Sequence, residues 1–205
     1  MGSRLYLLRH GETEYNVLDL YQGRADSPLT ELGKKQVLEI KNYIEKNGIV
    51  FDHVYSSPAG RAIETTELVT ETPYKIEQLL IERSFGSLEG TPMLHPRPGG
   101  NFPKEYGGES NDDLDARVVS IINEIMNREN HNSVLLSVHG GVARMFAQHY
   151  EKYSTKQIDK KTRTPNGSLF ILEKDGDIFR CIDIIVPKSS VIEKVETEIK
   201  LSKNN

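Results

Sequence analysis

The sequence predicts an α/β fold, namely a three-layer α/β/α sandwich with a mainly parallel central sheet and an antiparallel edge strand. Short apolar segments typical of buried strands alternate along the chain with amphipathic segments typical of helices, in the order β-α-β-α-β-loop-α-β-α-β-β. The last two apolar segments are joined through Asp175-Gly176-Asp177, which is a strong β-hairpin signal. The alternation favours parallel strands between two helical layers, and the hairpin adds the antiparallel pairing.

In the first half of the chain, strands and helices alternate around one long loop. Thr30 can cap the first helix, and Pro58 is tolerated near the first turn of the second. A loop as long as the one expected here is uncommon unless it has a function. The expected elements are a strand at 4–8, the loop at 12–29, a helix at 31–47, a strand at 52–55, a helix at 58–71 and a strand at 74–80.

In the second half, the segment 83–109 is rich in glycine and proline, and we interpret it as a lid or pocket wall. Ser110 or Asp112 can cap the helix that follows it. The expected elements are that helix to about residue 127, a strand at 133–138, a helix to about residue 150, and strands at 168–172 and 178–185.

The length of 205 residues fits one large domain with a full core. We predict a single domain over 1–187 and a C-terminal tail at 188–205, whose pattern fits a helix, a strand or a mobile end. The single cysteine, Cys181, falls in an apolar strand and is expected in the core.

Charge and hydropathy exclude several classes of partner. The net charge of −4 argues against a nucleic-acid or anionic-membrane binder, and no run approaches the length of a membrane span. Without a signal-peptide pattern, the cytoplasm is the expected location. The oligomeric state is left open, with a homodimer as one alternative.

Two predicted strands end in the same way, in an apolar run followed by His-Gly. They are Leu8-Arg9-His10-Gly11 and Val138-His139-Gly140-Gly141. Glycines at such points allow close approach of a ligand to the backbone, and the helix that starts at Gly140 favours an anion at its N-terminus. Two histidines at one edge of a sheet suggest either metal binding or phosphate chemistry.

The phosphate alternative has more support in the sequence. Neither His-x-x-x-His nor Cys-x-x-Cys occurs, and Glu12 and Glu14 stand among arginines that would oppose a bound cation, so no metal site is expected. Arg9 and Arg61 can instead bind a phosphate through two N–H groups each. Taken alone, Arg61 is an ordinary solvated helix residue and Arg9-His10-Gly11 an ordinary surface turn.

Glu82 follows the third predicted strand, at the same edge of the sheet as the two histidines. A carboxyl group beside a basic pocket is a plausible proton donor. Taken alone it is an ordinary surface glutamate. Arg83 next to it can contact a second anionic group of a substrate, although a solvated surface charge is the simpler interpretation.

Several further segments complete an ordered set that resembles the histidine phosphatase superfamily, also called the phosphoglycerate mutase-like fold. The resemblance covers roughly residues 5–172, and an agreement of this many segments in order is very specific. The segments are Leu8-Arg9-His10-Gly11-Glu12-Thr13 with Asn16; Gln22-Gly23-Arg24; Asp26-Ser27-Pro28-Leu29-Thr30-Glu31-Leu32-Gly33; Val54-Tyr55-Ser56-Ser57-Pro58 with Arg61-Ala62 and Thr65; Glu82-Arg83; Phe85-Gly86; Leu88-Glu89-Gly90; Gly108-Glu109-Ser110; and Val138-His139-Gly140-Gly141.

The resemblance implies a role for each matching position. His10 is implied as the nucleophile that forms a phosphohistidine, and Glu82 as the group that first gives and then takes a proton. Arg9, Arg61 and His139 are implied to hold the transferring phosphoryl group. The implied substrate and phosphate contacts are Asn16, Gln22, Gly23 and Gly140, to which Arg83 is added from its charge.

The resemblance leaves the acceptor of the phosphoryl group open. The short, Gly- and Pro-rich stretch 91–107 favours a phosphatase with no cofactor, because an open site admits water. The segment Glu82 to Gly90 is closer to the form in mutases, for which a 2,3-bisphosphoglycerate primer would be needed. A catalytically silent phospho-ligand binding module is the third hypothesis, and the presence of every implied catalytic residue argues against it.

Overall fold

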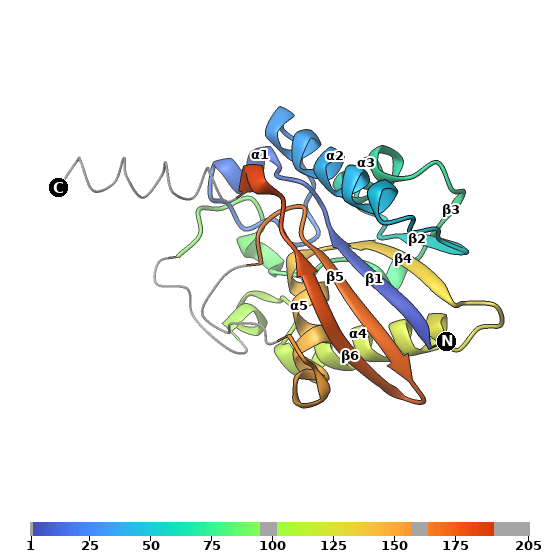
Figure 1. The fold of residues 1–205 in the computed structure, drawn as a ribbon. Helices are drawn as coiled ribbons and strands as arrows, with labels where there is room; N and C mark the ends of the chain where they lie inside the picture. Colours follow the sequence, from blue (N-terminus) through green and yellow to red (C-terminus); the bar gives the residue numbers. More distant parts are fainter. Residues whose placement is uncertain (1, 95–101, 157–163, 191–205) are drawn as a thin grey trace.

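The computed structural model describes residues 2–94, 102–156 and 164–190, and in this part of the chain the predicted α/β sandwich is confirmed. A six-stranded sheet has the order β3-β2-β4-β1-β5-β6 (Figure 1). Its strands are β1 (Ser3–Arg9), β2 (His53–Ser56), β3 (Tyr74–Ile76), β4 (Ser133–Val138), β5 (Leu169–Asp175) and β6 (Ile178–Ile185).

The sheet is mainly parallel, as expected. β1, β4, β2 and β3 pair in parallel with their neighbours, whereas β5 runs antiparallel to both β1 and β6. The predicted hairpin therefore forms, and the edge strand β6 pairs antiparallel with β5. Gly176 has a φ of 58° in its turn, a conformation that favours glycine.

Helices cover both faces of the sheet, α2 and α3 on one side and α4 and α5 on the other (Figure 1). Thr30 caps α2 through a hydrogen bond from the N–H of Gly33 at 2.9 Å, and Ser110 rather than Asp112 caps α4. The bounds are α1 (Glu14–Val17), α2 (Glu31–Lys46), α3 (Gly60–Val69), α4 (Asn111–Met126) and α5 (Gly140–His149). α1 is a single turn inside the predicted loop at 12–29.

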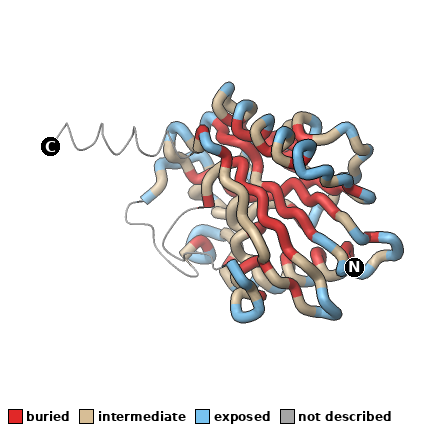
Figure 2. The backbone as a smooth tube through the Cα atoms, in the orientation of Figure 1, coloured by how far each residue is buried: buried red, intermediate tan, exposed pale blue. Residues whose placement is uncertain are grey.

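Side chains of the central strands alternate between two hydrophobic cores. Leu5 and Leu7 of β1 pack with α4 and α5, whereas Tyr6 and Leu8 pack with α2 and α3. The central strands are accordingly buried except at their ends (Figure 2). Cys181 lies fully buried in the first core, as predicted, and burial raises the pKa of its thiol to about 12. Among the described residues, no helix is long and apolar enough to cross a membrane.

One predicted strand is shorter than expected. The strand predicted at 74–80 ends at Ile76, and a 3₁₀ turn follows at Gln78–Leu80. Its neighbour β2 ends at Ser56, which pairs with Ile76. Beyond this pair, β3 has no partner strand with which to continue the ladder. The carboxylate of Glu77 also accepts the N–H of Leu79 at 3.2 Å and starts the turn. Glu82 therefore does not stand at a strand end.

The structure describes only part of the predicted lid or pocket wall at 83–109 and only the start of the predicted tail at 188–205. Residues 83–94 and 102–109 form loops with short 3₁₀ turns at Gly86–Leu88 and Phe102–Tyr106. Most of the predicted tail, from residue 191 onward, lies outside the described residues.

Candidate active site

The carboxyl ends of β1 and β4 bring two histidines together. Arg9 pairs with Val138 in parallel register, so His10 and His139 leave the sheet side by side. The N–H of His10 donates to the carbonyl of Val138 at 3.1 Å. The two imidazole rings lie with their centroids 5.4 Å apart and their planes at 64°. The two His-Gly strand ends noted in the sequence thus meet at one point.

The turn at Gly11 holds His10 in one tautomer. The ring Nδ1 lies 2.7 Å from the carbonyl oxygen of Gly11. Since a carbonyl oxygen only accepts, this bond assigns the hydrogen to Nδ1 and leaves the lone pair on Nε2. Nε2 is therefore the nitrogen of His10 that can attack an electrophile.

Both histidines are neutral at neutral pH. Burial holds the pKa of His10 well below its ordinary value, and the guanidinium groups of Arg61 and Arg9 lower it further. The pKa of His139 is also held well below its ordinary value, first by burial and then by Arg61, His10 and Arg9. A neutral His10 is a condition for nucleophilic attack, and the two arginines help to meet it.

His139 is completely buried and is fixed by a serine. Its Nε2 lies 2.6 Å from the hydroxyl oxygen of Ser57, which directly follows β2. Its Nδ1 is buried and has no hydrogen-bond partner among the residues that the structure describes. If the hydroxyl of Ser57 donates to Nε2, the neutral ring carries its hydrogen on Nδ1 and offers it to an anion.

The guanidinium of Arg61 enters from α3 and is almost completely buried, with 1% of its surface exposed. Nη1 donates to the carbonyl of Ala25 at 2.8 Å and to the carboxylate of Asp26 at 2.9 Å, and Nη2 donates to the carbonyl of Gly23 at 2.7 Å. These bonds leave the Nε–H and one N–H of Nη2, and Nε has no hydrogen-bond partner in the described part of the chain. Two donors of Arg61 thus remain for a phosphate.

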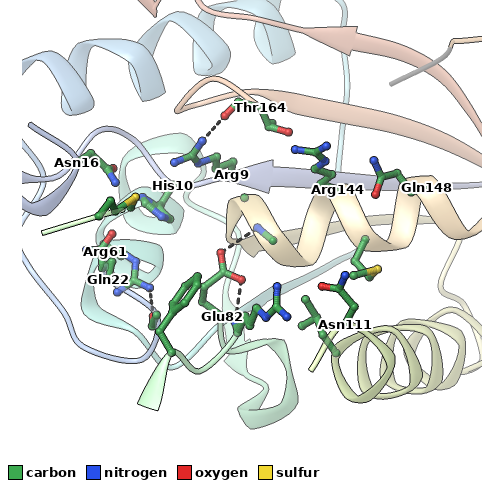
Figure 3. Close-up of a pocket in the computed structure, with 18 of the residues that line it drawn as sticks. Arg9, His10, Asn16, Gln22, Arg61, Glu82, Asn111, Arg144, Gln148 and Thr164 are labelled. Carbon is green, nitrogen blue, oxygen red and sulfur yellow. Dashed lines mark hydrogen bonds between the residues drawn. The ribbon is translucent and has the colours of Figure 1, made fainter. Parts of the chain in front are cut away.

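Glu82 lies on the other side of the cavity from Asn16 (Figure 3). One carboxylate oxygen accepts the N–H of Arg83 at 2.8 Å, and the other accepts the N–H of Gly141 at 2.9 Å. These two bonds orient the carboxyl group towards the start of α5. A carboxyl group held in this way can transfer a proton to or from a group bound near His10.

Asn16 presents its amide N–H₂ group to the cavity because its oxygen is occupied. The oxygen accepts from the side chain of Asn166 at 2.8 Å and from the N–H of Thr13 at 3.2 Å. Asn166 also donates to the carbonyl of Gly11 at 3.2 Å, so it fixes the histidine turn and Asn16 together. Sequence reasoning missed Asn166, which is 150 residues away from its partner.

The glycines of the two strand ends lie close to other protein groups. A Cβ on Gly11 would lie 2.4 Å from the carbonyl oxygen of Gly33, so this glycine allows close packing of α2 rather than of a ligand. At the other strand end, the N–H of Gly141 is taken by Glu82. A Cβ on Gly140 would lie 3.2 Å from the guanidinium carbon of Arg9, which itself donates to the carbonyl of Thr164.

A cavity of about 360 Å³ joins these side chains. It is lined by every residue predicted from the sequence except His139, which lies behind the lining. Gln22 is held at both ends, by the hydroxyl of Thr13 at 3.3 Å and that of Ser27 at 3.0 Å. The predicted residues that line the cavity are Arg9, His10, Asn16, Gln22, Gly23, Arg61, Glu82, Arg83 and Gly140.

The far end of the cavity contains side chains that the sequence reasoning missed. Arg144 and Gln148 come from α5, and Asn111 comes from the start of α4 (Figure 3). The spacing of four residues from Gly140 to Arg144 and on to Gln148 places them on one face of a helix, which is a signal that was available. Among the described residues, no cluster of His, Cys, Asp and Glu is arranged to hold a metal.

Comparisons with known proteins identify the family of the chain. The model of the histidine phosphatase superfamily (branch 1) matches residues 5–185. A Saccharomyces cerevisiae protein named as a broad-specificity phosphatase is 31% identical over 77% of this chain and 74% of its own. A Proteus mirabilis protein named as a probable phosphoglycerate mutase is 30% identical over 67% of this chain and 69% of its own.

Among solved structures, a phosphoglycerate mutase from Bacillus anthracis has a similar fold. The TM-score is 0.76 at 22% identity, and the match covers 94% of this chain and 96% of that one. Fold, site and family match lead to the same assignment: the chain belongs to the histidine phosphatase superfamily.

Proposed function

We propose that this protein is a metal-independent phosphomonoester hydrolase that acts on small phosphorylated metabolites through a phosphohistidine intermediate. The observation that carries the proposal is the state of His10. Its imidazole is buried and neutral, and its Nδ1 is tied to the carbonyl of Gly11, so Nε2 meets the cavity as a lone pair. A neutral imidazole with a free lone pair on Nε2 is better suited to act as a nucleophile than as a proton carrier.

In the first step, Nε2 of His10 attacks the phosphorus atom. The N–P bond forms as the bond from phosphorus to the ester oxygen breaks, and Glu82 acts as the general acid that gives a proton to the departing alkoxide. In the second step, Glu82 takes a proton from water, the water oxygen bonds to phosphorus, and the N–P bond breaks. The products are the alcohol and inorganic phosphate, and His10 and Glu82 return to their starting states.

Donors around the transferring group carry most of the remaining catalysis. Phosphoryl transfer depends on in-line positioning and on charge stabilisation at the equatorial oxygens. Two N–H groups of Arg61, the amide of Asn16 and the guanidinium of Arg9 meet at the same cavity as His10. We assign His139 a supporting role through its Nδ1. Arginine charge takes the place that a metal ion has in other phosphoryl-transfer sites.

The cavity volume supports a small substrate. About 360 Å³ lies near the lower end of the range usual for ligand pockets. Polar side chains fit a leaving group with its own polar substituents, namely Arg144, Gln148 and Asn111 at the far end and Arg83 next to Glu82. Met93, Phe85 and Leu114 add an apolar wall.

A mutase is the second candidate, in which an alcohol rather than water accepts the phosphoryl group. The segment from Glu82 to Gly90 resembles the mutase form, and one relative is named as a probable phosphoglycerate mutase. We favour hydrolysis because the segment 91–107 is shorter than the corresponding insertion of the glycolytic mutases that the sequence resembles. A shorter segment covers less of the site and excludes less water.

The deciding experiment runs two assays side by side. Release of inorganic phosphate is measured over a panel of small phosphomonoesters, and isomerisation is measured with 3-phosphoglycerate and the bisphosphate primer. The expected result is that phosphate release from the best ester of the panel exceeds isomerisation of 3-phosphoglycerate. Isomerisation that outpaces phosphate release would overturn the hydrolase assignment in favour of the mutase.

A further inference from the structure

Glu82 stands on a segment that has no ladder or helix of its own. β3 ends at Ile76, and the described residues between it and α4, 77–94 and 102–110, form 3₁₀ turns and loops. Proton transfer nevertheless requires a carboxyl group to be held to within a fraction of an ångström. Something outside the sheet must therefore fix this segment.

Arg117 of α4 hydrogen-bonds to the segment on the N-terminal side of Glu82. Its Nη1 donates to the carbonyl of Leu79 at 2.6 Å and to the carbonyl of Ile81 at 2.9 Å. Its Nε and Nη2 form a two-point ion pair with the carboxylate of Glu109, both at 2.7 Å. One guanidinium thus joins the residue just before Glu82 to the start of α4.

The backbone of Glu109 hydrogen-bonds to the C-terminal side of the same segment. Its N–H donates to the carbonyl of Ser84 at 2.9 Å, and its carbonyl accepts from Nε of Arg83 at 2.8 Å. Glu82 is therefore bracketed, with Arg117 holding the chain before it and Glu109 holding the chain after it.

The bracket is sheltered from solvent but separate from the cavity. The side chains of Arg117 and Glu109 are only 13% and 10% exposed, so water screens their interaction weakly. Neither residue lines the cavity. The pair contacts the segment of Glu82 and Arg83 directly, and it acts on the rest of the site only through the charge of Arg117, which also lowers the pKa of His139.

We propose that the Arg117–Glu109 pair is a positioning device for Glu82, and that proton transfer to the leaving alcohol depends on it. The inference rests on the proposed function only in that Glu82 acts as the proton donor. It holds equally if the phosphoryl acceptor is water or an alcohol, because both reactions share the first step.

Two esters with different leaving groups separate positioning from general damage. p-Nitrophenolate departs without a proton, whereas the alkoxide of glycerol 3-phosphate requires one. For Arg117→Lys, Arg117→Met and Glu109→Gln, kcat/KM is measured on both esters, with Glu82→Gln as the reference. We expect losses of about 30-fold or more on the alkyl ester and less than about threefold on the aryl ester, as a weaker version of Glu82→Gln.

Equal losses on the two esters, or no loss on either, would show that the pair only supports the fold. A second measurement adds Arg117→Lys to Glu82→Gln. No further loss on the alkyl ester is expected, because the acid is already absent, and fully additive losses would contradict the proposal. Arg117→Lys and Glu109→Gln keep the test intact if Arg117→Met does not fold.

Arg180→Ala is the matched control, since it removes an exposed arginine from its ion pair with Asp175 on the hairpin, far from the site in the sequence. It should leave both kcat/KM values unchanged. Failure of the proposed function looks different, because wild-type protein would then turn over neither ester.

Discussion

The two sides of the active site are built by different means. On one side, His10 and His139 directly follow β1 and β4. Arg61 lies in the first turn of α3, which is the helix after β2. All three are at least nine-tenths buried over the sheet. On the other side, Glu82 and Arg83 stand on a loop that is half-buried and is held by Arg117 and Glu109.

The difference separates two demands of the chemistry. In the proposed mechanism, the side with His10, His139 and Arg61, here called the phosphate side, holds donors in fixed positions, which a rigid sheet edge does without further help. The side with Glu82 and Arg83, here called the acid side, moves a proton onto leaving groups of different shape, and a loop held by an ion pair can be adjusted without disturbing the sheet. We infer that substitutions on the first side affect every substrate, whereas those on the second depend on the leaving group.

The largest effect is expected from the phosphate side. His10→Ala removes the nucleophile and should lower kcat by about 10⁴-fold or more on aryl and alkyl esters alike. His149→Ala, which removes a half-exposed histidine paired with Asp115, is the matched control and should retain activity. If His10→Ala still releases phosphate from any ester at the parent rate, the phosphohistidine mechanism is wrong.

The acid side should show a selective loss. Glu82→Gln keeps the size of the side chain but cannot donate a proton, so kcat/KM should fall by about 10²- to 10³-fold on an alkyl ester and much less on p-nitrophenyl phosphate. Glu124→Gln, on the solvent side of α4, serves as the control. Steady-state kinetics on the two esters measure the contrast, and equal losses would assign Glu82 to binding rather than to proton transfer.

The two buried histidines should make the phosphate side sensitive to acid. Their pKa values are lowered in the folded state, so below about pH 6.5 the unfolded chain takes up protons that the folded protein does not. Stability should be full above that pH and fall as the pH drops, by up to about 1.4 kcal/mol per pH unit for each histidine.

Urea unfolding between pH 7.5 and pH 5 measures this loss. The slope for His139→Gln should be shallower than that of the parent by up to about 1.4 kcal/mol per pH unit. Parallel curves for the two proteins would contradict a neutral, buried His139.

The smallest effect is expected at Glu89, which hydrogen-bonds to both sides of the site. The carboxylate of Glu89 accepts the N–H of Ala25, beside Arg61, at 2.8 Å and the N–H of Phe85, beyond Glu82, at 2.9 Å. Glu89→Gln turns one acceptor into a donor, which should cost about 1 kcal/mol of unfolding free energy. Thermal or urea unfolding measures this cost, and a change below about 0.3 kcal/mol would mean that the two sides are coupled by other contacts.

Hydrophobic periodicity and turn chemistry were sufficient to predict most of the architecture. The strand at 133–138, the Thr30 cap and the hairpin at Asp175-Gly176-Asp177 agree with the structure because each depends on neighbouring residues. The strand expected at 74–80 was wrong beyond Ile76, because a strand needs a partner and β2 ends first. The side chains of Asn166 and Arg117 were not recognised, since each takes its place through residues distant in the sequence. Arg144 was missed although its spacing from Gly140 was a local signal.

By itself, the sequence determined the sheet, its helical layers and the two His-Gly strand ends, because alternating burial and parallel pairing bring such ends to one edge whatever the loops do. Only the tertiary structure decided which tautomer His10 adopts, which donors of Arg61 remain for a phosphate, and how Glu82 is held. The first depends on the conformation of the turn at Gly11, which packing against α2 fixes, and the other two depend on hydrogen bonds between segments far apart in the chain. No local sequence pattern encodes these contacts.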